Sequence, residues 1–254
     1  MTSHESAAEG ALPTSDVAPE KVSTTHPPAP ADADGPVVGA RGALARVIVV
    51  SGPSGSGKSR LARQLCASHG WPFVNLDDFY RDHDAPDLPR FASGEIDWDN
   101  AGTWNVEAAA QSLERLCRTG ATDVPQYSIS QSRATGTHSV TLDGARFVVA
   151  EGIFAPDVIA PLAERGVLGE AWCLRRNRTV TAARRFIRDV AERRKPPLVL
   201  VRRGARLWRD EPELVRAHLA RGAQPVTFSE AVRRAAALQS STLCRAHLGG
   251  AQGA

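Results

Sequence analysis

Cysteine is scarce in this chain, and its four residues are far apart. Cys66, Cys117, Cys173 and Cys244 form no C-x-x-C pair. This spacing argues against a zinc site and against a disulfide framework, and it favours reduced thiols in a cytosol. We therefore expect a cytoplasmic protein.

Long apolar runs are also missing. No stretch approaches the roughly 18 consecutive apolar residues that a transmembrane helix needs. The first ten residues, MTSHESAAEG, lack the basic start and apolar core of a secretory signal. The sequence thus predicts no membrane partner. Its 254 residues, 42% hydrophobic and 23% charged, suffice for one substantial α/β domain or two small ones.

Lysine occurs only at positions 21, 58 and 195, so most of the positive charge is arginine. None of these lysines belongs to an Asn-Lys-x-Asp motif, with which a GTPase normally reads guanine. Residues 1–40 carry six acids and one base, whereas residues 41–254 carry 30 bases and 22 acids, a net charge of +8. A basic body suits an anionic ligand such as a nucleotide or a nucleic acid.

The residue pattern divides the chain into three regions. Residues 1–43, rich in Ala, Pro, Ser, Thr and Asp, predict a disordered tail because they have too few large apolar groups for a core. We expect residues 44–245 to form the folded domain and residues 246–254 to form a frayed C-terminus. No internal repeat divides the domain further.

Strands and helices are expected to alternate along the domain. The strands expected are 46–50, 73–76, 146–150 and 170–174, and the helices are 58–69, 105–118, 156–165, 211–220 and 228–238. A long arginine-rich helix is expected after Asn177, and a hairpin is expected over residues 139–152 around the Asp143-Gly144 turn. The alternation predicts an α/β fold, with a mostly parallel sheet and helices on both faces.

The stretch GPSGSGKS, residues 52–59, matches the G-x-x-x-x-G-K-[ST] pattern in full, between an expected strand and an expected helix. Its glycines allow successive backbone N–H groups to point inward at phosphate. Lys58 would reach the β- and γ-phosphates of a nucleoside triphosphate, and the Ser59 hydroxyl would ligate Mg²⁺. The expected nucleotide-binding residues are Gly52, Ser54, Gly55, Ser56, Gly57, Lys58, Ser59 and Arg60. This loop alone does not separate a kinase from an ATPase or a GTPase.

Acidic residues follow two of the expected strands. Asp77 and Asp78 should lie at the carboxyl end of their strand, near the phosphate loop. Glu151 ends another strand, where it could hold Mg²⁺ directly or through water, or could simply start a helix. The arginines of residues 183–195 form either a solvated helix face or a mobile lid that neutralises the triphosphate.

Taken together and in this order, the motifs resemble the uridine kinase family, within the P-loop kinases that include phosphoribulokinases. The resemblance covers about residues 46–200 and rests on GPSGSGKS (52–59), LDDFYR (76–81), DWDNAGTW (97–104), VPQYSISQSR (124–133), VVAEGIFA (148–155) and RRFIRDVAERRK (184–195). It implies a P-loop NTPase fold with a helical Arg-rich lid. It also implies an ATP- and Mg²⁺-dependent kinase that phosphorylates the 5′-hydroxyl of uridine or cytidine.

The resemblance also assigns roles to single residues. Asp77 would be the base that accepts the hydroxyl proton, and Asp78 would be only a local cap. For the acceptor, Tyr80 would line the site, Asp99 would hold ribose hydroxyls and Tyr127 would contact the base. The remaining assignments concern arginines: Arg185 would hold sugar and phosphate, and Arg188 and Arg193, with Lys195, would form the lid.

Departures from the family pattern leave the acceptor open. Gln131 stands where the family has a base-reading histidine, in a segment one residue shorter, and Trp98 replaces a smaller aromatic residue. Glutamine can both donate and accept, so it remains compatible with pyrimidine. The alternatives are a P-loop kinase for another small alcohol and a non-catalytic ATP-binding regulator. Nucleic acid is disfavoured, because few aromatics interleave with the arginines, and a homo-oligomer is left open.

Overall fold

The computed structural model describes residues 44–176, 179, 181 and 197–249. The expected tail, the arginine-rich helix and the end of the chain from residue 250 lie outside these ranges. Short 3₁₀ helices join several of the main elements: η1 (Leu76–Phe79), η2 (Ala101–Thr103) and η3 (Ala155–Val158).

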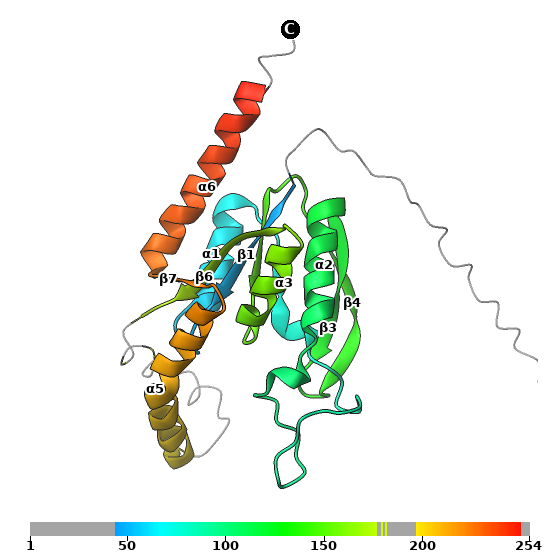
Figure 1. Cartoon of the computed structure of the whole chain (residues 1–254), viewed down its shortest axis with the longest axis vertical. Helices are drawn as coiled ribbons and strands as arrows, with labels where there is room; N and C mark the ends of the chain where they lie inside the picture. Colours follow the sequence, from blue (N-terminus) through cyan, green and yellow to red (C-terminus); the bar gives the residue numbers. More distant parts are fainter. Residues whose placement is uncertain (1–43, 177–178, 180, 182–196, 250–254) are drawn as a thin grey trace, which may run out of the picture. The chain divides into compact units, whose positions relative to one another are not determined.

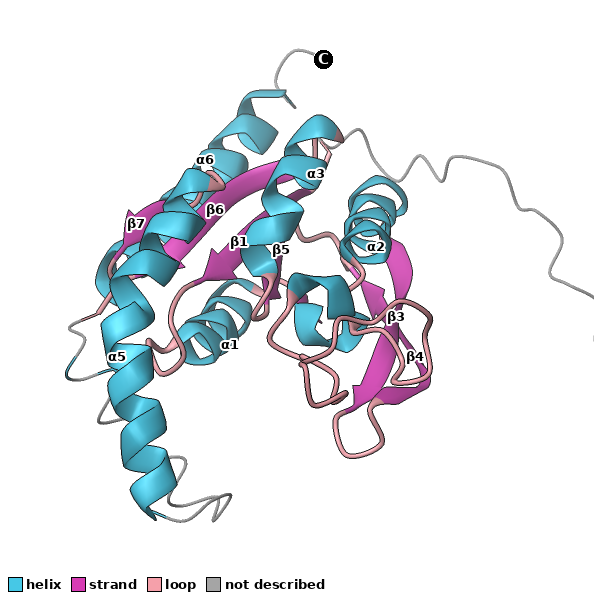
Figure 2. Cartoon of the chain, turned by 60° about the horizontal axis from the view of Figure 1, so that its bottom comes forward, coloured by secondary structure: helices cyan, strands magenta, loops and turns pink. Residues whose placement is uncertain are grey.

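Five parallel strands form the central sheet, in the order β2-β5-β1-β6-β7. Figure 2 shows β5, β1, β6 and β7 side by side. Their bounds are β1 (Arg46–Ser51), β2 (Phe73–Asn75), β5 (Phe147–Glu151), β6 (Leu168–Leu174) and β7 (Gln224–Val226). The predicted parallel sheet is therefore confirmed. Strand β1 lies in the middle, so the loop that follows it opens at the centre of the carboxyl edge, where open α/β sheets bind ligands.

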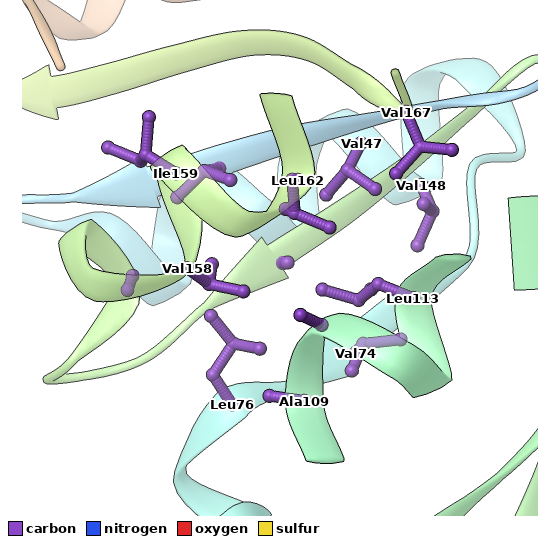
Figure 3. Packing of buried hydrophobic residues seen from close by; sticks show 14 of the residues in the cluster. Val47, Val74, Leu76, Ala109, Leu113, Val148, Val158, Ile159, Leu162 and Val167 are labelled. Atoms are coloured by element: carbon purple, nitrogen blue, oxygen red, sulfur yellow. The ribbon is translucent and has the colours of Figure 1, made fainter. Parts of the chain in front are cut away.

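Helices cover both faces of this sheet, as predicted. Side chains alternate along β1, so Val47 and Val49 belong to one buried cluster and Ile48 and Val50 to the other. The first cluster includes residues of α2 (Val106–Thr119) and α3 (Ile159–Glu164), and Figure 3 shows several of them converging on the sheet. The second includes residues of α1 (Lys58–His69) and α6 (Phe228–Gly249).

A separate two-stranded sheet consists of β3 (Ala121–Ser128) and β4 (Arg133–Thr141), which pair antiparallel. The hairpin predicted over residues 139–152 is therefore wrong. Asp143 and Gly144 do form a tight turn with positive φ angles of 48° and 83°. The strand after the turn, however, is buried along its whole length. It joins the parallel sheet between β2 and β1, while β4 returns along β3.

The C-terminal helices are longer than the sequence pattern predicted. Helix α5 runs over Pro197–Ala220 and contains Pro212 (Figure 1). A proline inside a helix is unfavourable, so the pattern favoured a start near residue 211. Helix α6 continues past residue 238 to Gly249, which makes residues 246–249 helical, and the three-residue strand β7 was not predicted. Within the described part of the chain, no helix is long and apolar enough to cross a membrane.

Candidate active site

The phosphate loop, residues 52–59, connects β1 to α1 and depends on glycine geometry. Gly52 has a φ of 138°, and a Cβ atom there would lie 2.7 Å from the Leu174 carbonyl oxygen. Gly55 and Gly57 also have positive φ angles, 83° and 103°, and Gly57 is the N-cap of α1. The start of this 12-residue helix therefore faces the loop with its free N–H groups, an arrangement that favours phosphate.

Polar side chains gather inside this loop. The Lys58 Nζ atom lies 3.8 Å from Glu151 Oε1 and donates to the Pro53 carbonyl oxygen at 3.4 Å. The Ser59 hydroxyl donates to Glu151 Oε2 at 3.0 Å. Ser56 is 1% exposed, and its hydroxyl has no hydrogen-bond partner in the described structure. An unpaired buried hydroxyl and a lysine both suit a triphosphate.

The Ser59 and Glu151 pair has the chemistry of a magnesium site. Mg²⁺ takes oxygen ligands, and it is typically bound through one or two carboxylates together with substrate phosphates and water. Glu151 is 8% exposed, and its burial raises the pKa of the carboxyl, although Lys58 and the Ser59 hydroxyl act in the opposite direction. Among the described residues, no group of three or more His, Cys, Asp or Glu could hold a metal by itself. These two side chains therefore fit Mg²⁺ only as part of a nucleotide complex.

Asp77 lies directly after β2, beside the end of β5. Its Oδ1 atom accepts a hydrogen bond from the Ile153 backbone N–H at 2.7 Å. A Cβ atom at Gly152 would be 2.8 Å from the same oxygen, so glycine is needed where this backbone segment passes Asp77. Burial raises the Asp77 pKa, the Ile153 amide and the Lys58 charge lower it, and the Asp78 charge raises it. A half-buried carboxylate thus lies within electrostatic reach of the phosphate loop.

The neighbouring carboxylate, Asp78, contacts a different part of the molecule. Its Oδ1 atom accepts a hydrogen bond from the Tyr127 backbone N–H in β3 at 3.2 Å. The side chain that caps η1 is that of Asn75, which accepts from the Asp77 N–H at 3.3 Å. The expectation that Asp78 is only a local cap is therefore wrong.

Four aromatic rings form a cluster beside Asp77, which we call the aromatic cluster: Tyr80, Trp98, Tyr127 and Phe154. The ring of Tyr80 lies 5.9, 5.7 and 5.8 Å from those of Trp98, Tyr127 and Phe154, centroid to centroid. Its hydroxyl donates to the Trp98 carbonyl oxygen at 3.3 Å. Burial, with the charges of Asp77 and Asp99, raises the Tyr80 pKa, so its phenol is neutral. Phe154 was not predicted as a site residue.

A surface pocket of about 560 Å³ lies beyond Trp98, between the loop after η1 and the turn of the β3–β4 hairpin. The structure brings Gln131 into this pocket, whereas Asp99 is exposed and does not line it. Four other lining residues were not identified from the sequence, because they come from a loop without a recognisable motif: His83, Arg90, Glu95 and Ile96. Ser132, from the VPQYSISQSR motif, also lines the pocket but had not been assigned a role.

A second pocket, of about 490 Å³, lies at the carboxyl ends of β6 and β7. It was not predicted from the sequence, and it is lined by Arg175, Arg176, Pro225, Val226, Thr227 and Glu230. The Arg175 N–H donates to the Val226 carbonyl oxygen at 2.8 Å, which joins the two strand ends. Because β6 pairs with β1, and Leu174 lies against Gly52, this pocket adjoins the phosphate loop.

Of the four arginines predicted to bind nucleotide or acceptor, the structure describes only Arg60. The Arg60 guanidinium lies over the Phe228 ring, 5.3 Å from its centroid, and so links α1 to α6. Its role in nucleotide binding stays a prediction. Arg185, Arg188 and Arg193 lie outside the described residues, and so does Lys195.

Known proteins resemble this chain in sequence and in fold. Uridine kinase from Saccharomyces cerevisiae is 30% identical over 112 residues, which are 43% of this chain. The chain spans only about a fifth of that relative's length, 22%. A proposed fructose transport system kinase from Silicibacter sp. TM1040 has a similar fold, with a TM-score of 0.50, 18% identity and coverage of 70% of this chain and 87% of its own.

A possible uridine kinase from Bacillus stearothermophilus is more distant, with a TM-score of 0.41 and 19% identity over 61% of this chain and 83% of its own. The decisive match is to a family model. The model of the phosphoribulokinase / uridine kinase family matches residues 47–196, which include the phosphate loop, Asp77, the β3–β4 hairpin and Glu151. The chain belongs to the phosphoribulokinase / uridine kinase family.

Proposed function

We propose that this protein is an ATP- and Mg²⁺-dependent kinase that transfers the γ-phosphoryl group to a hydroxyl of a small molecule. The first candidate acceptor is the 5′-hydroxyl of a pyrimidine nucleoside, uridine or cytidine. One observation carries the proposal. The half-buried carboxylate of Asp77 lies within electrostatic reach of both Lys58 in the phosphate loop and Tyr80 in the aromatic cluster, with one oxygen held by the Ile153 amide at 2.7 Å.

The donor nucleotide would bind on the side of the phosphate loop. Its phosphates would accept hydrogen bonds from the loop amides and from Lys58, and the pocket at Arg175 and Arg176 would hold the rest of the nucleotide. Ser59 and Glu151 would hold Mg²⁺, which when bound neutralises phosphate charge. Outside the described residues, Arg185, Arg188 and Arg193 keep their predicted roles at the sugar and in the lid.

Asp77 would act as the base. Its Oδ1 atom is engaged by Ile153, which leaves Oδ2 for the acceptor hydroxyl. As the bond from the hydroxyl oxygen to the γ-phosphorus forms, the bond from that phosphorus to the bridging oxygen breaks and ADP leaves. The hydroxyl proton passes to Asp77. The raised pKa of this carboxyl makes it a stronger base than an ordinary aspartate.

The aromatic cluster would position the acceptor. Tyr80, Trp98 and Tyr127 present flat rings near Asp77, and such rings suit a planar heterocycle. Gln131 lines the adjoining pocket, where its amide could donate to and accept from a base edge. Asp99, which is exposed, could bind ribose hydroxyls.

A kinase for another small alcohol is the second candidate, because of the charges in the acceptor pocket. Arg90 and Glu95 both line it, and within the described structure they form no ion pair with each other. Such groups could bind a polar acceptor other than a nucleoside. A non-catalytic ATP-binding regulator is the remaining alternative, and activity measurements separate it from both kinases.

The test is ADP release from ATP and Mg²⁺ across a panel of nucleosides, sugars and other small alcohols. We expect a pyrimidine nucleoside to stimulate release, and Asp77→Asn to lower the stimulated rate about a hundredfold or more. The matched control is Asp84→Asn, which changes an exposed aspartate of the same loop and should leave the rate unchanged. ATP binding without stimulation by any acceptor would favour the regulator, and stimulation by an alcohol other than a nucleoside would favour the second candidate.

A further inference from the structure

Hydrogen bonds join residues 78–83, which we call the anchoring segment, to the outer part of the β3–β4 hairpin. Two of its aspartates accept hydrogen bonds from hairpin amides, and two of its backbone groups bond to the hairpin as well. These four contacts are Asp78 Oδ1 to Tyr127 N at 3.2 Å, Arg81 O to Tyr127 Oη at 3.3 Å, Asp82 Oδ1 to Ala134 N at 2.8 Å, and His83 N to Ser132 O at 2.9 Å. In a fifth contact, the His83 Nδ1 atom lies 3.2 Å from the same Ser132 oxygen.

Buried apolar packing holds the other end of this hairpin, whereas at the outer end the Tyr127 ring lies 5.7 Å from that of Tyr80. Val124 and Val140 are buried in the main core, near the start of β3 and the end of β4. Residues 133–139 of β4 are all exposed. The register also shifts between Gln126 and Tyr127, so the ladder is irregular where the anchoring segment meets it. The position of the outer hairpin therefore depends on these polar contacts, together with the ring contact of Tyr127 with Tyr80.

We propose that Asp78 is a positioning residue, which fixes the β3–β4 hairpin, and Tyr127 with it, relative to the base Asp77. The two aspartates are adjacent in the single 3₁₀ turn η1. The Asp77 side chain accepts a hydrogen bond from the Ile153 N–H after β5, and the Asp78 side chain accepts one from the Tyr127 N–H in the hairpin. This inference rests on the proposed function, because it assumes that the hairpin binds the acceptor.

The arrangement accounts for two neighbouring carboxylates that repel each other. The Asp78 charge raises the Asp77 pKa, so their proximity has an electrostatic cost. A carboxylate accepting from a backbone N–H forms a stronger hydrogen bond than a neutral group does. The base and the anchor then move as one rigid turn, so the acceptor ring and the base keep a fixed separation.

Three variants separate the hydrogen bond from the charge. Asp78→Ala removes the acceptor atom, Asp78→Asn keeps an oxygen that can accept from Tyr127 N–H, and Asp84→Ala is the matched control. In Asp78→Ala we expect the KM for the acceptor to rise about tenfold, with kcat within about threefold and the ATP Kd unchanged. Asp78→Asn should stay within about threefold of the wild type in all three parameters.

Hydrogen exchange of the backbone amides, followed by mass spectrometry, tests the anchor without any acceptor. Peptides that cover residues 125–134 should exchange faster in Asp78→Ala than in the wild type, whereas Asp78→Asn and Asp84→Ala should retain protection. Unchanged exchange in Asp78→Ala would overturn the proposal. So would an Asp78→Asn variant as impaired as Asp78→Ala, since the charge alone would then matter. If no acceptor stimulates the wild type, the proposed function fails, and the exchange result still decides whether Asp78 anchors the hairpin.

Discussion

The donor side and the acceptor side of this site are built in different ways. On the donor side, residues 52–59 follow a strand that is buried from Val47 to Ser51, and glycine backbone angles set the shape of the loop. On the acceptor side, a long irregular segment meets a largely exposed hairpin, and side chains bond to backbone groups about fifty residues away in sequence. One short stretch of sequence can provide phosphate recognition, whereas the acceptor pocket forms only when several distant segments of the chain come together.

Charge separates the two sides as well. Lys58, Arg175 and Arg176 lie around the phosphate loop and its adjoining pocket. Residues 77–100, on the acceptor side, include eight acidic residues and two arginines. This contrast suits an anionic donor and an acceptor without negative charge.

The largest expected effect comes from breaking the donor side at Gly52. Gly52→Ala places a Cβ atom 2.7 Å from the Leu174 carbonyl oxygen, at a φ angle that alanine rarely adopts. We expect ATP affinity and transfer to fall about a hundredfold or more, because the loop must shift. Calorimetric titration with ATP measures the loss. The matched control is Gly136→Ala in β4, which meets no atom within 4 Å and should leave ATP affinity unchanged.

The next largest effect is the pH dependence of stability, which we expect from a buried histidine near β6 on the donor side. His218 is 5% exposed, and its Nδ1 atom lies 3.8 Å from Cys173 Sγ of β6. Burial, with the charges of Lys58 and Arg221, lowers the His218 pKa to about 4. Between pH 6.5 and 4 the unfolded chain therefore binds a proton that the native state excludes, and stability falls by about 3 kcal/mol as the pH is lowered.

Urea unfolding at several pH values tests this account. His218→Gln should remove that part of the pH slope. His138→Gln, which changes an exposed histidine of the acceptor hairpin, should leave the slope as it is in the wild type. An identical slope in all three proteins would show that His218 does not exclude the proton.

An intermediate effect is expected on the acceptor side at Trp98. Trp98→Ala removes a ring 5.9 Å from that of Tyr80, and the indole wall of the acceptor pocket with it. We expect the KM of the acceptor to rise about tenfold while the ATP Kd stays constant. Steady-state kinetics and ATP titration measure the two quantities. Phe91→Ala, at a ring on the same loop that is 52% exposed, is the control and should change neither.

The smallest effect is the change in thermal stability expected at Asp77, where the two sides meet. Burial raises the pKa of Asp77 in the folded protein. Above that pKa the folded protein therefore holds a negative charge that its surroundings disfavour. Asp77→Asn removes this cost and can still accept from the Ile153 N–H. We expect a melting temperature about 2 °C higher at pH 8, with a smaller gain as the pH falls and the wild-type carboxyl is protonated. A lower melting temperature at pH 8 would contradict the sign.

The sequence was most informative where a local pattern decides the structure. The parallel sheet with helices on both faces and the positions of four of its strands, β1, β2, β5 and β6, were predicted correctly, because residue periodicity encodes them. Asp143 and Gly144 show the limit of such reasoning. Their turn was identified correctly, yet the partners of the flanking strands depend on distant residues, so the hairpin was misplaced.

The acceptor side was the least predictable part. The hydrogen bond from Tyr127 N–H to Asp78 spans 49 residues, and no pattern around Asp78 indicates it. His83, Arg90 and Glu95 entered the site only through the folding of loops. The second pocket likewise arises because β6 and β7 end side by side, and the three-residue strand β7 carries too little periodicity to be predicted.

The most direct test of the central claim, that a hydroxyl held beside Asp77 receives the phosphoryl group, is to follow the label from γ-³²P-ATP. Wild-type protein, ATP, Mg²⁺ and a pyrimidine nucleoside are incubated, and the products are separated. We predict labelled nucleoside 5′-monophosphate with the wild type and almost none with Asp77→Asn, although both bind ATP. Label found only in inorganic phosphate, at equal rates in both proteins, would contradict the account.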